Sequence, residues 1–102
     1  MSKRVRLVVV DDHVLFRRGL ISLLADFPEI QVVGEAGDGR EALGVIETCS
    51  PDLVLLDVNM PVMDGIQTVQ AIRDKKNRVP ILMLTISRQE DDLLGGGVGD
   101  MA

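Results

Sequence analysis

Short runs of branched aliphatic residues recur four times along this chain, and a helical pattern follows the runs. They are Val5–Val10, Ile30–Val33, Leu53–Leu56 and Ile81–Leu84. Runs that are apolar on both faces are typical of buried parallel strands, because helices cover both faces of such a sheet. The alternation of strands and helices therefore predicts an α/β fold with a parallel sheet.

Capping residues and prolines predict where the helices begin and end. The expected N-cap residues are Asp12, Asp38 and Asp64, and the last two have Glu or Gln at the capping-box position. The first two helices are expected to end before Pro28 and Pro51. The expected inner faces are Phe16, Leu20, Leu23 and Phe27, then Ala42, Val45, Ile46 and Cys49, then Ile66, Val69 and Ile72. A fourth helix is expected over residues 89–94.

The length of 102 residues is enough for one domain, which we expect to cover residues 1–94, followed by a glycine-rich tail over residues 95–102. A formal net charge of −5 gives no electrostatic reason for this chain to bind nucleic acid directly. No apolar stretch approaches the ~18 residues of a membrane span. The apolar run before Asp11 is too short for a secretory signal. We therefore expect a cytoplasmic protein that does not enter a membrane.

Polar side chains follow three of the four predicted strands. Asp11 and Asp12 come after the first strand, Asp57 after the third and Thr85 after the fourth. Ligands of open parallel sheets bind outside the carboxyl ends of the strands. If the first and third strands are neighbours, three carboxylates meet there, and Mg²⁺ is the hard cation that such oxygen ligands suit. An Asp can also accept a phosphoryl group as an acyl phosphate.

Each of these residues also has a plainer explanation. Asp is common after a strand as a turn or capping residue, so capping explains Asp12 alone as well as metal binding does. The plainer explanation is also favoured for Asp57 alone, and only the combination of strand ends favours a site. His13 is interpreted as a surface or capping residue, and Arg17 and Arg18 as a solvated face, with a partner surface left open.

Three segments resemble the receiver domain of response regulators, the CheY-like domain of two-component systems. They are Val-Val-Asp-Asp-His at residues 9–13, Leu-Leu-Asp-Val-Asn-Met-Pro-Val-Met-Asp-Gly at residues 55–65 and Leu-Met-Leu-Thr at residues 82–85. Residues 12–20 further resemble the NarL/FixJ subfamily, whose effector is a LuxR-type helix-turn-helix. The resemblance covers roughly residues 5–94.

The resemblance implies a flavodoxin-like doubly wound sheet of order 2-1-3-4-5. It implies that Asp57 accepts a phosphoryl group from a sensor histidine kinase. Asp12, with Asp11 beside it, and the backbone carbonyl of Asn59 would hold Mg²⁺ with Asp57, and Thr85 would be the switch hydroxyl. Pro61 and Gly65 would shape the loop beside the site. The implied role is a signalling switch that regulates a transcriptional effector in a parent protein and is not a conventional enzyme.

The sequence departs from this family after Thr85, because no lysine follows it and no fifth strand and helix are apparent. The family places a phosphate-pairing lysine at the end of the fifth strand. We therefore expect Mg²⁺ binding to survive better than phosphorylation-driven switching. The strand Ile81–Leu84 would become an open edge, and the first helix would expose some of its apolar residues. A homodimer or domain-swapped dimer through that strand is one hypothesis.

Three other functions compete with the phosphoacceptor: a pseudo-receiver, a phosphatase and a flavin-binding protein. A pseudo-receiver would act through protein contact or dimerisation without phosphate, which the missing lysine favours and the retained acids disfavour. A phosphatase with Asp57 as nucleophile needs a general acid two residues later, where this chain has Asn59. A flavin-binding protein of the same fold would need aromatic residues around the ring, and aromatics are only 2% of this chain.

Overall fold

The computed structural model describes residues 4–58 and 64–84. The elements in this part of the chain are β1 (Val5–Val10), α1 (Val14–Leu24), β2 (Ile30–Ala36), α2 (Gly39–Cys49), β3 (Leu53–Asp57), α3 (Gly65–Asp74) and β4 (Ile81–Leu84). The predicted fourth helix and the glycine-rich tail lie outside the described residues.

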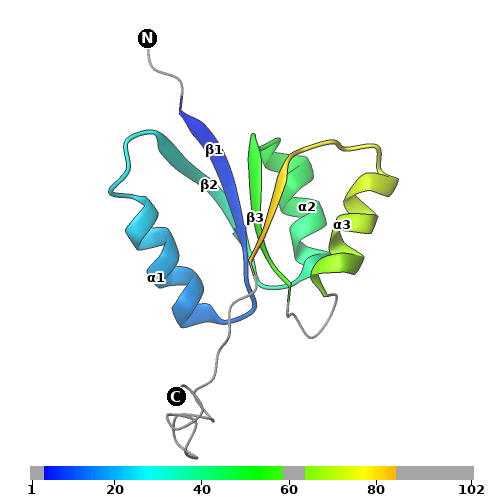
Figure 1. The fold of residues 1–102 in the computed structure, drawn as a ribbon, viewed down its shortest axis with the longest axis horizontal. Coiled ribbons are helices and arrows are strands. Elements are labelled where there is room, and N and C mark those ends of the chain that lie inside the picture. The colour runs from blue at the N-terminus through cyan, green and yellow to red at the C-terminus, as the bar shows by residue number, and fades with distance from the viewer. Residues whose placement is uncertain (1–3, 59–63, 85–102) are drawn as a thin grey trace, which may run out of the picture.

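The described strands form one parallel sheet in the order β2-β1-β3-β4. The predicted α/β class and the first four positions of the flavodoxin-like order are therefore confirmed. Helix α1 covers one face of the sheet, and α2 and α3 cover the other (Figure 1). Strand β1 lies between β2 and β3, so the residues that follow it are at the centre of the sheet edge.

Successive residues of β1 face opposite layers, as the pleat of a strand requires. Val8 and Val10 belong to the larger core under α2 and α3, whereas Leu7 and Val9 pack toward α1. The buried residues of the larger core are Val8, Val10, Ala36, Ala42, Ile46, Val54, Leu56, Ile72 and Val79. The core on the α1 side of the sheet is smaller, and no residue of α1 itself is buried. As predicted, the inner face of α2 includes Ala42 and Ile46, with Val45 and Cys49 partly buried.

Strand β2 is longer than predicted and contains an irregularity. Its register with β1 shifts between Leu7 and Val8, and the strand continues to Ala36 instead of ending at Val33. A Cβ atom on Gly34 would lie 2.7 Å from the Cγ1 atom of Val45. Glycine at this position therefore allows α2 to pack closely on β2, although glycine interrupts the apolar run from which the strand was predicted.

Helix α1 is shorter than predicted, and its apolar face is narrower. It ends at Leu24, after which a turn closes with a 3.0 Å bond from the Phe27 amide to the Leu24 carbonyl. Phe27 and Leu23 are 48% and 58% exposed, so the inner-face prediction for these two residues is wrong. The apolar spacing continued through residues that are no longer helical, and spacing alone does not show where a helix ends.

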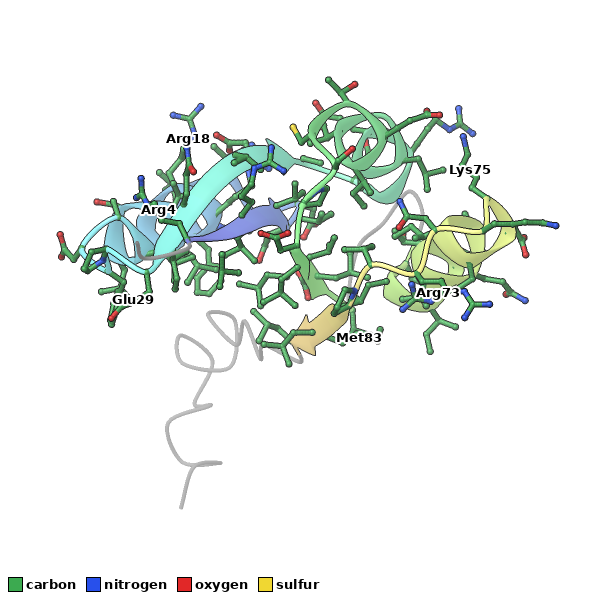
Figure 2. The ribbon with its side chains drawn as sticks, turned by 90° about the horizontal axis from the view of Figure 1, so that it is seen from above. Arg4, Arg18, Glu29, Arg73, Lys75 and Met83 are labelled. Carbon is green, nitrogen blue, oxygen red and sulfur yellow. The ribbon has the colours of Figure 1, made fainter. Side chains whose placement is uncertain are left out.

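Strand β4 is the end strand of the described sheet and is largely uncovered. Leu82 is 52% exposed and Met83 is 37% exposed. The open-edge prediction for this strand also depends on the residues after Leu84, which lie outside the described residues. Met83 lies on this outer strand, away from the α1 side of the sheet (Figure 2).

Among the residues that the structure describes, no helix has the length and apolar character needed to cross a membrane.

Candidate functional site

The pairing of β1 with β3 brings two strand ends together. Val10 is in register with Leu56, and the next residues along each strand are Asp11 and Asp57. Both aspartates are only 1% exposed. Because parallel strands end at the same edge of a sheet, these acids lie side by side at its carboxyl end.

Asp12 joins these two residues to form a cluster of three carboxylates. One carboxylate oxygen from each of Asp11, Asp12 and Asp57 lies within 4.8 Å of the others. Asp12 is half-buried. Acidic side chains are seldom buried unless hydrogen bonds or an opposite charge compensate them, and here two of the three acids are buried.

Hydrogen bonds fix Asp11 from both β2 and α1. Its amide donates a 3.0 Å bond to the carbonyl of Ala36, the last residue of β2. Its carboxylate Oδ1 accepts a 2.7 Å bond from the amide of His13. Its own carbonyl accepts a 2.6 Å bond from Nη1 of Arg17. The first aspartate after β1 is therefore held by an acceptor at the end of β2 and by two donors at the start of α1.

The start of α3 lies against the end of β3 on the other side of the cluster. The amide of Gly65 donates a 2.9 Å bond to the carbonyl of Val58, the residue that follows Asp57. The amide of Val58 in turn donates a 3.1 Å bond to the carbonyl of Leu84 at the end of β4. Strand β4 and helix α3 thus both fix the chain at the point where Asp57 ends its strand.

The three carboxylates fit a hard divalent cation. Mg²⁺ is bound in proteins through one or two carboxylates together with water and phosphate oxygens. The cluster supplies oxygen ligands from neighbouring strand ends and concentrates negative charge there. A divalent cation would offset the repulsion between these carboxylates, which makes Asp11, Asp12 and Asp57 suitable ligands for Mg²⁺.

The structure brings together three of the residues that the sequence singled out. The proximity of Asp11, Asp12 and Asp57 is confirmed. Asn59 and Thr85 lie outside the described residues. The prediction that Asp12 caps α1 is wrong, because the N-cap is His13, whose Nδ1 accepts a 3.2 Å bond from the Phe16 amide. Of the two interpretations of His13, as a surface residue or as a capping residue, the second is therefore confirmed.

Arg17 was interpreted as a solvated side chain, and the structure contradicts this. Its side chain is 12% exposed and contacts both Asp11 and Glu35, whereas the side chain of Arg18 is 68% exposed. Arg18 reaches the outside of the molecule (Figure 2). The signal in the sequence was the position of Arg17 one helical turn after His13, where a long side chain can reach back to the end of β1.

Comparison with known families gives one match over most of the chain. Residues 7–96 match the family described as the response regulator receiver domain. This range includes all seven described elements except the first two residues of β1. It also includes the whole carboxylate cluster.

Two curated relatives show what kinds of protein contain a similar segment. A protein-glutamate methylesterase/protein-glutamine glutaminase of Nocardioides sp. is 44% identical, over 94% of this chain and 28% of the relative. The nitrate/nitrite response regulator protein NarL of Escherichia coli is 38% identical, over 86% of this chain and 41% of the relative. The chain thus spans less than half the length of either relative.

A solved structure agrees with the fold described above. The signal receiver domain of the putative response regulator NarL from Mycobacterium tuberculosis superposes with a TM-score of 0.75. The two sequences are 44% identical, and the match covers 80% of this chain and 66% of that one. The sheet order and the helices on both faces are therefore those of a receiver-type α/β domain.

Proposed function

The chain belongs to the response regulator receiver domain family and is of the NarL/FixJ type, and we propose on that basis that Asp57 is its phosphoacceptor. The observation that carries the proposal is the position of Asp57. It ends a central strand, is 1% exposed and lies with its carboxylate against those of Asp11 and Asp12. An acid in this position combines a nucleophilic oxygen with neighbouring ligands for a cation.

The proposed reaction is transfer of a phosphoryl group from a phosphohistidine of a sensor kinase. An Asp57 carboxylate oxygen attacks phosphorus, the P–O bond of an acyl phosphate forms, and the P–N bond breaks with its electron pair remaining on the imidazole nitrogen. When bound, Mg²⁺ supplies positive charge that offsets the negative charge of the transferring group. Asp11 and Asp12 would hold the cation, and the fixed end of β3 would orient the nucleophile.

Two further roles follow from the family resemblance. The backbone carbonyl of Asn59 would complete the protein ligands of Mg²⁺. The hydroxyl of Thr85 would donate a hydrogen bond to a phosphoryl oxygen and so report phosphorylation to the rest of the domain. Replacement of Thr85 by Val would keep the side-chain shape, and should leave phosphorylation of Asp57 intact while weakening any response to it.

The proposed output is control of an effector in a longer protein. NarL is named as a nitrate/nitrite response regulator, and the segment at residues 12–20 resembles regulators with a LuxR-type helix-turn-helix. We therefore propose that this receiver acts in the cytoplasm and regulates transcription through an attached domain, without contacting nucleic acid itself. The methylesterase relative shows that a similar segment also occurs beside an enzyme.

The test is chemical phosphorylation of the chain with acetyl phosphate and Mg²⁺, followed by intact mass. The wild-type protein should gain one phosphoryl group, and hydroxylamine should remove it, as expected for an acyl phosphate. Asp57→Asn should gain none. Asp74→Asn is a matched control, because Asp74 is an exposed acid on α3 outside the cluster. An adduct that persists in Asp57→Asn would contradict the assignment.

The pseudo-receiver alternative predicts a different pair of results, namely no adduct on the wild-type chain and no measurable Mg²⁺ binding.

Self-association through β4 stays a prediction that rests on the exposed Leu82 and Met83. Size-exclusion chromatography with light scattering should show a concentration-dependent dimer that Leu82→Lys abolishes, because an inserted charge opposes strand pairing at an open edge.

A further inference from the structure

Arg17 connects the ends of two neighbouring strands behind the carboxylate cluster. Its Nη1 donates a 2.6 Å bond to the carbonyl of Asp11, directly after β1. Its Nε donates a 2.7 Å bond to Oε1 of Glu35 in β2. One guanidinium group therefore holds a backbone oxygen and a carboxylate from different strands at once, which its fork of donors allows.

The burial of Arg17 distinguishes this contact from a surface ion pair. Its side chain is 12% exposed, and a Cβ atom on Gly37 would lie 3.2 Å from its Nη1 atom. Glycine at position 37 thus leaves the space that the guanidinium occupies. The neighbouring Arg18 also approaches Glu35, at 3.5 Å, but its side chain is 68% exposed and makes no described bond to Asp11.

The carbonyl that Arg17 binds belongs to the peptide group joining Asp11 to Asp12. The orientation of that peptide sets the direction in which the chain leaves Asp11, and therefore where the Asp12 carboxylate lies. On the other side of the same residue, the Asp11 amide is bonded to Ala36 and its carboxylate to the His13 amide. Arg17 provides the side-chain donor that fixes this peptide from the carbonyl side.

We propose that Arg17 is a positioning residue for the cation site, acting through the Asp11–Asp12 peptide. The inference rests on the proposed function, because it concerns the same three carboxylates. Without a fixed peptide, repulsion would favour movement of Asp12 away from Asp11 and Asp57, since their carboxylates lie within 4.8 Å. Arg17 holds Asp12 in place before a cation arrives, so less ordering is needed when Mg²⁺ binds.

The substitution Arg17→Met tests this role, because Met keeps an unbranched apolar side chain and removes every donor. In a Mg²⁺ titration of the whole chain by calorimetry, this variant should bind Mg²⁺ about tenfold more weakly than wild type, which is the usual effect of losing a group that orients a metal ligand. Arg18→Met is the matched control and should stay within about twofold of wild type, since exposed ion pairs contribute little.

Two further variants separate positioning from folding. Arg17→Lys keeps the charge but has one ammonium group, which cannot span Asp11 and Glu35 as the guanidinium does, so it should restore only part of the Mg²⁺ affinity. Glu35→Gln removes the ion pair and leaves the bond from Arg17 to the Asp11 carbonyl, so it should weaken Mg²⁺ binding less than Arg17→Met. If Arg17→Met does not fold, Arg17→Lys decides: affinity equal to that of wild type overturns the proposal.

A measurement without Mg²⁺ distinguishes this inference from the function on which it rests. The amide resonance of Asp12 in the cation-free protein should move in Arg17→Met and stay in place in Arg18→Met. If wild type binds Mg²⁺ and both methionine variants bind it equally well, the positioning role is wrong and the phosphoacceptor site stands. If wild type binds no Mg²⁺ at all, the metal site and the role of Arg17 in it are both overturned.

Discussion

Gly65 lies directly against the backbone of Val58. A Cβ atom on Gly65 would be 2.7 Å from the Cα atom of Val58, and the Gly65 amide donates a 2.9 Å bond to the Val58 carbonyl. The first residue of α3 therefore contacts the residue that follows Asp57, with no space for a side chain between them. This contact places the start of α3 beside the carboxylate cluster.

Replacing Gly65 with Ala should destabilise the protein. The added methyl group would meet backbone atoms, which cannot rotate away, so α3 or the end of β3 must shift, and the free energy of unfolding should fall by about 1–3 kcal/mol. Urea denaturation measures this change. Gly44→Ala in α2 is the matched control, because nothing lies within 4 Å of its Cβ position, and it should raise the free energy of unfolding by about 0.5–1 kcal/mol.

Two isoleucines of α3 should respond very differently to truncation. Ile72 is 1% exposed, and Ile72→Ala should lower the free energy of unfolding by about 2–5 kcal/mol through lost burial and the cavity left behind. Ile66 is 64% exposed, and Ile66→Ala should change it by no more than about 0.5 kcal/mol. Equal losses in thermal or urea unfolding would show that Ile66 packs against other residues.

The substitution Asp12→Asn should have opposite effects on stability with and without a divalent cation. Without Mg²⁺ it removes one of three clustered charges and should raise the free energy of unfolding by about 1 kcal/mol, since unit charges about 4 Å apart repel by that much even in bulk water. At a Mg²⁺ concentration of about 100 times Kd, wild type should gain about 2.7 kcal/mol.

The Asp12→Asn variant should gain much less from Mg²⁺ than wild type at the same concentration. Thermal unfolding in chelator and in excess Mg²⁺ gives both comparisons. A variant that is less stable than wild type in chelator would argue that hydrogen bonds of Asp12 outweigh the charge repulsion.

The cap of α3 should contribute measurable stability beside the site. Asp64 accepts a 2.8 Å bond from the Gln67 amide, and the Gln67 side chain accepts a 3.1 Å bond from the Asp64 amide. Asp64→Ala should lower the free energy of unfolding by about 1 kcal/mol, whereas Asp64→Ser keeps an acceptor and should retain most of it. Similar losses in the two variants would place the contribution of Asp64 in its charge and not in capping.

Much of the fold and the heart of the site could be predicted from the sequence. The strands were found because β1 and β3 are apolar on both faces, and Asp11, Asp12 and Asp57 were expected to meet because neighbouring parallel strands end at one edge. The apolar pattern alone does not show that β1 and β3 are neighbours. That adjacency follows from the strand order that the family resemblance implies.

Apolar spacing predicted the buried face of α3 only in part. The helix buries Gly65, Thr68 and Ile72 and exposes Ile66. Thr68 can be fully buried because its hydroxyl donates a 2.8 Å bond to the Asp64 carbonyl, so the polar group is satisfied within the helix. The predicted inner face of α3 is therefore right for Val69 and Ile72, which pack in the larger core, and wrong for Ile66 alone.

The contacts of Arg17 with Asp11 and Glu35 could not be predicted from the sequence either. A pair of adjacent arginines on a helix resembles a solvated face, and only the packed structure shows that one of them reaches a backbone carbonyl. Long side chains bury their stems and carry their charge to distant partners, so the sequence position of the residue does not reveal the contact.

The central position of β1 bears on the order in which the chain folds. β1 pairs with β2 across a shorter loop than the one that separates it from β3, so the entropy lost on closing the loop favours the β1–β2 pair first. Asp11 and Asp12 meet Asp57 only when β3 joins this pair. The β1–β2 pair can therefore form before the acids meet, and repulsion between Asp57 and the two acids after β1 arises only when β3 joins the sheet.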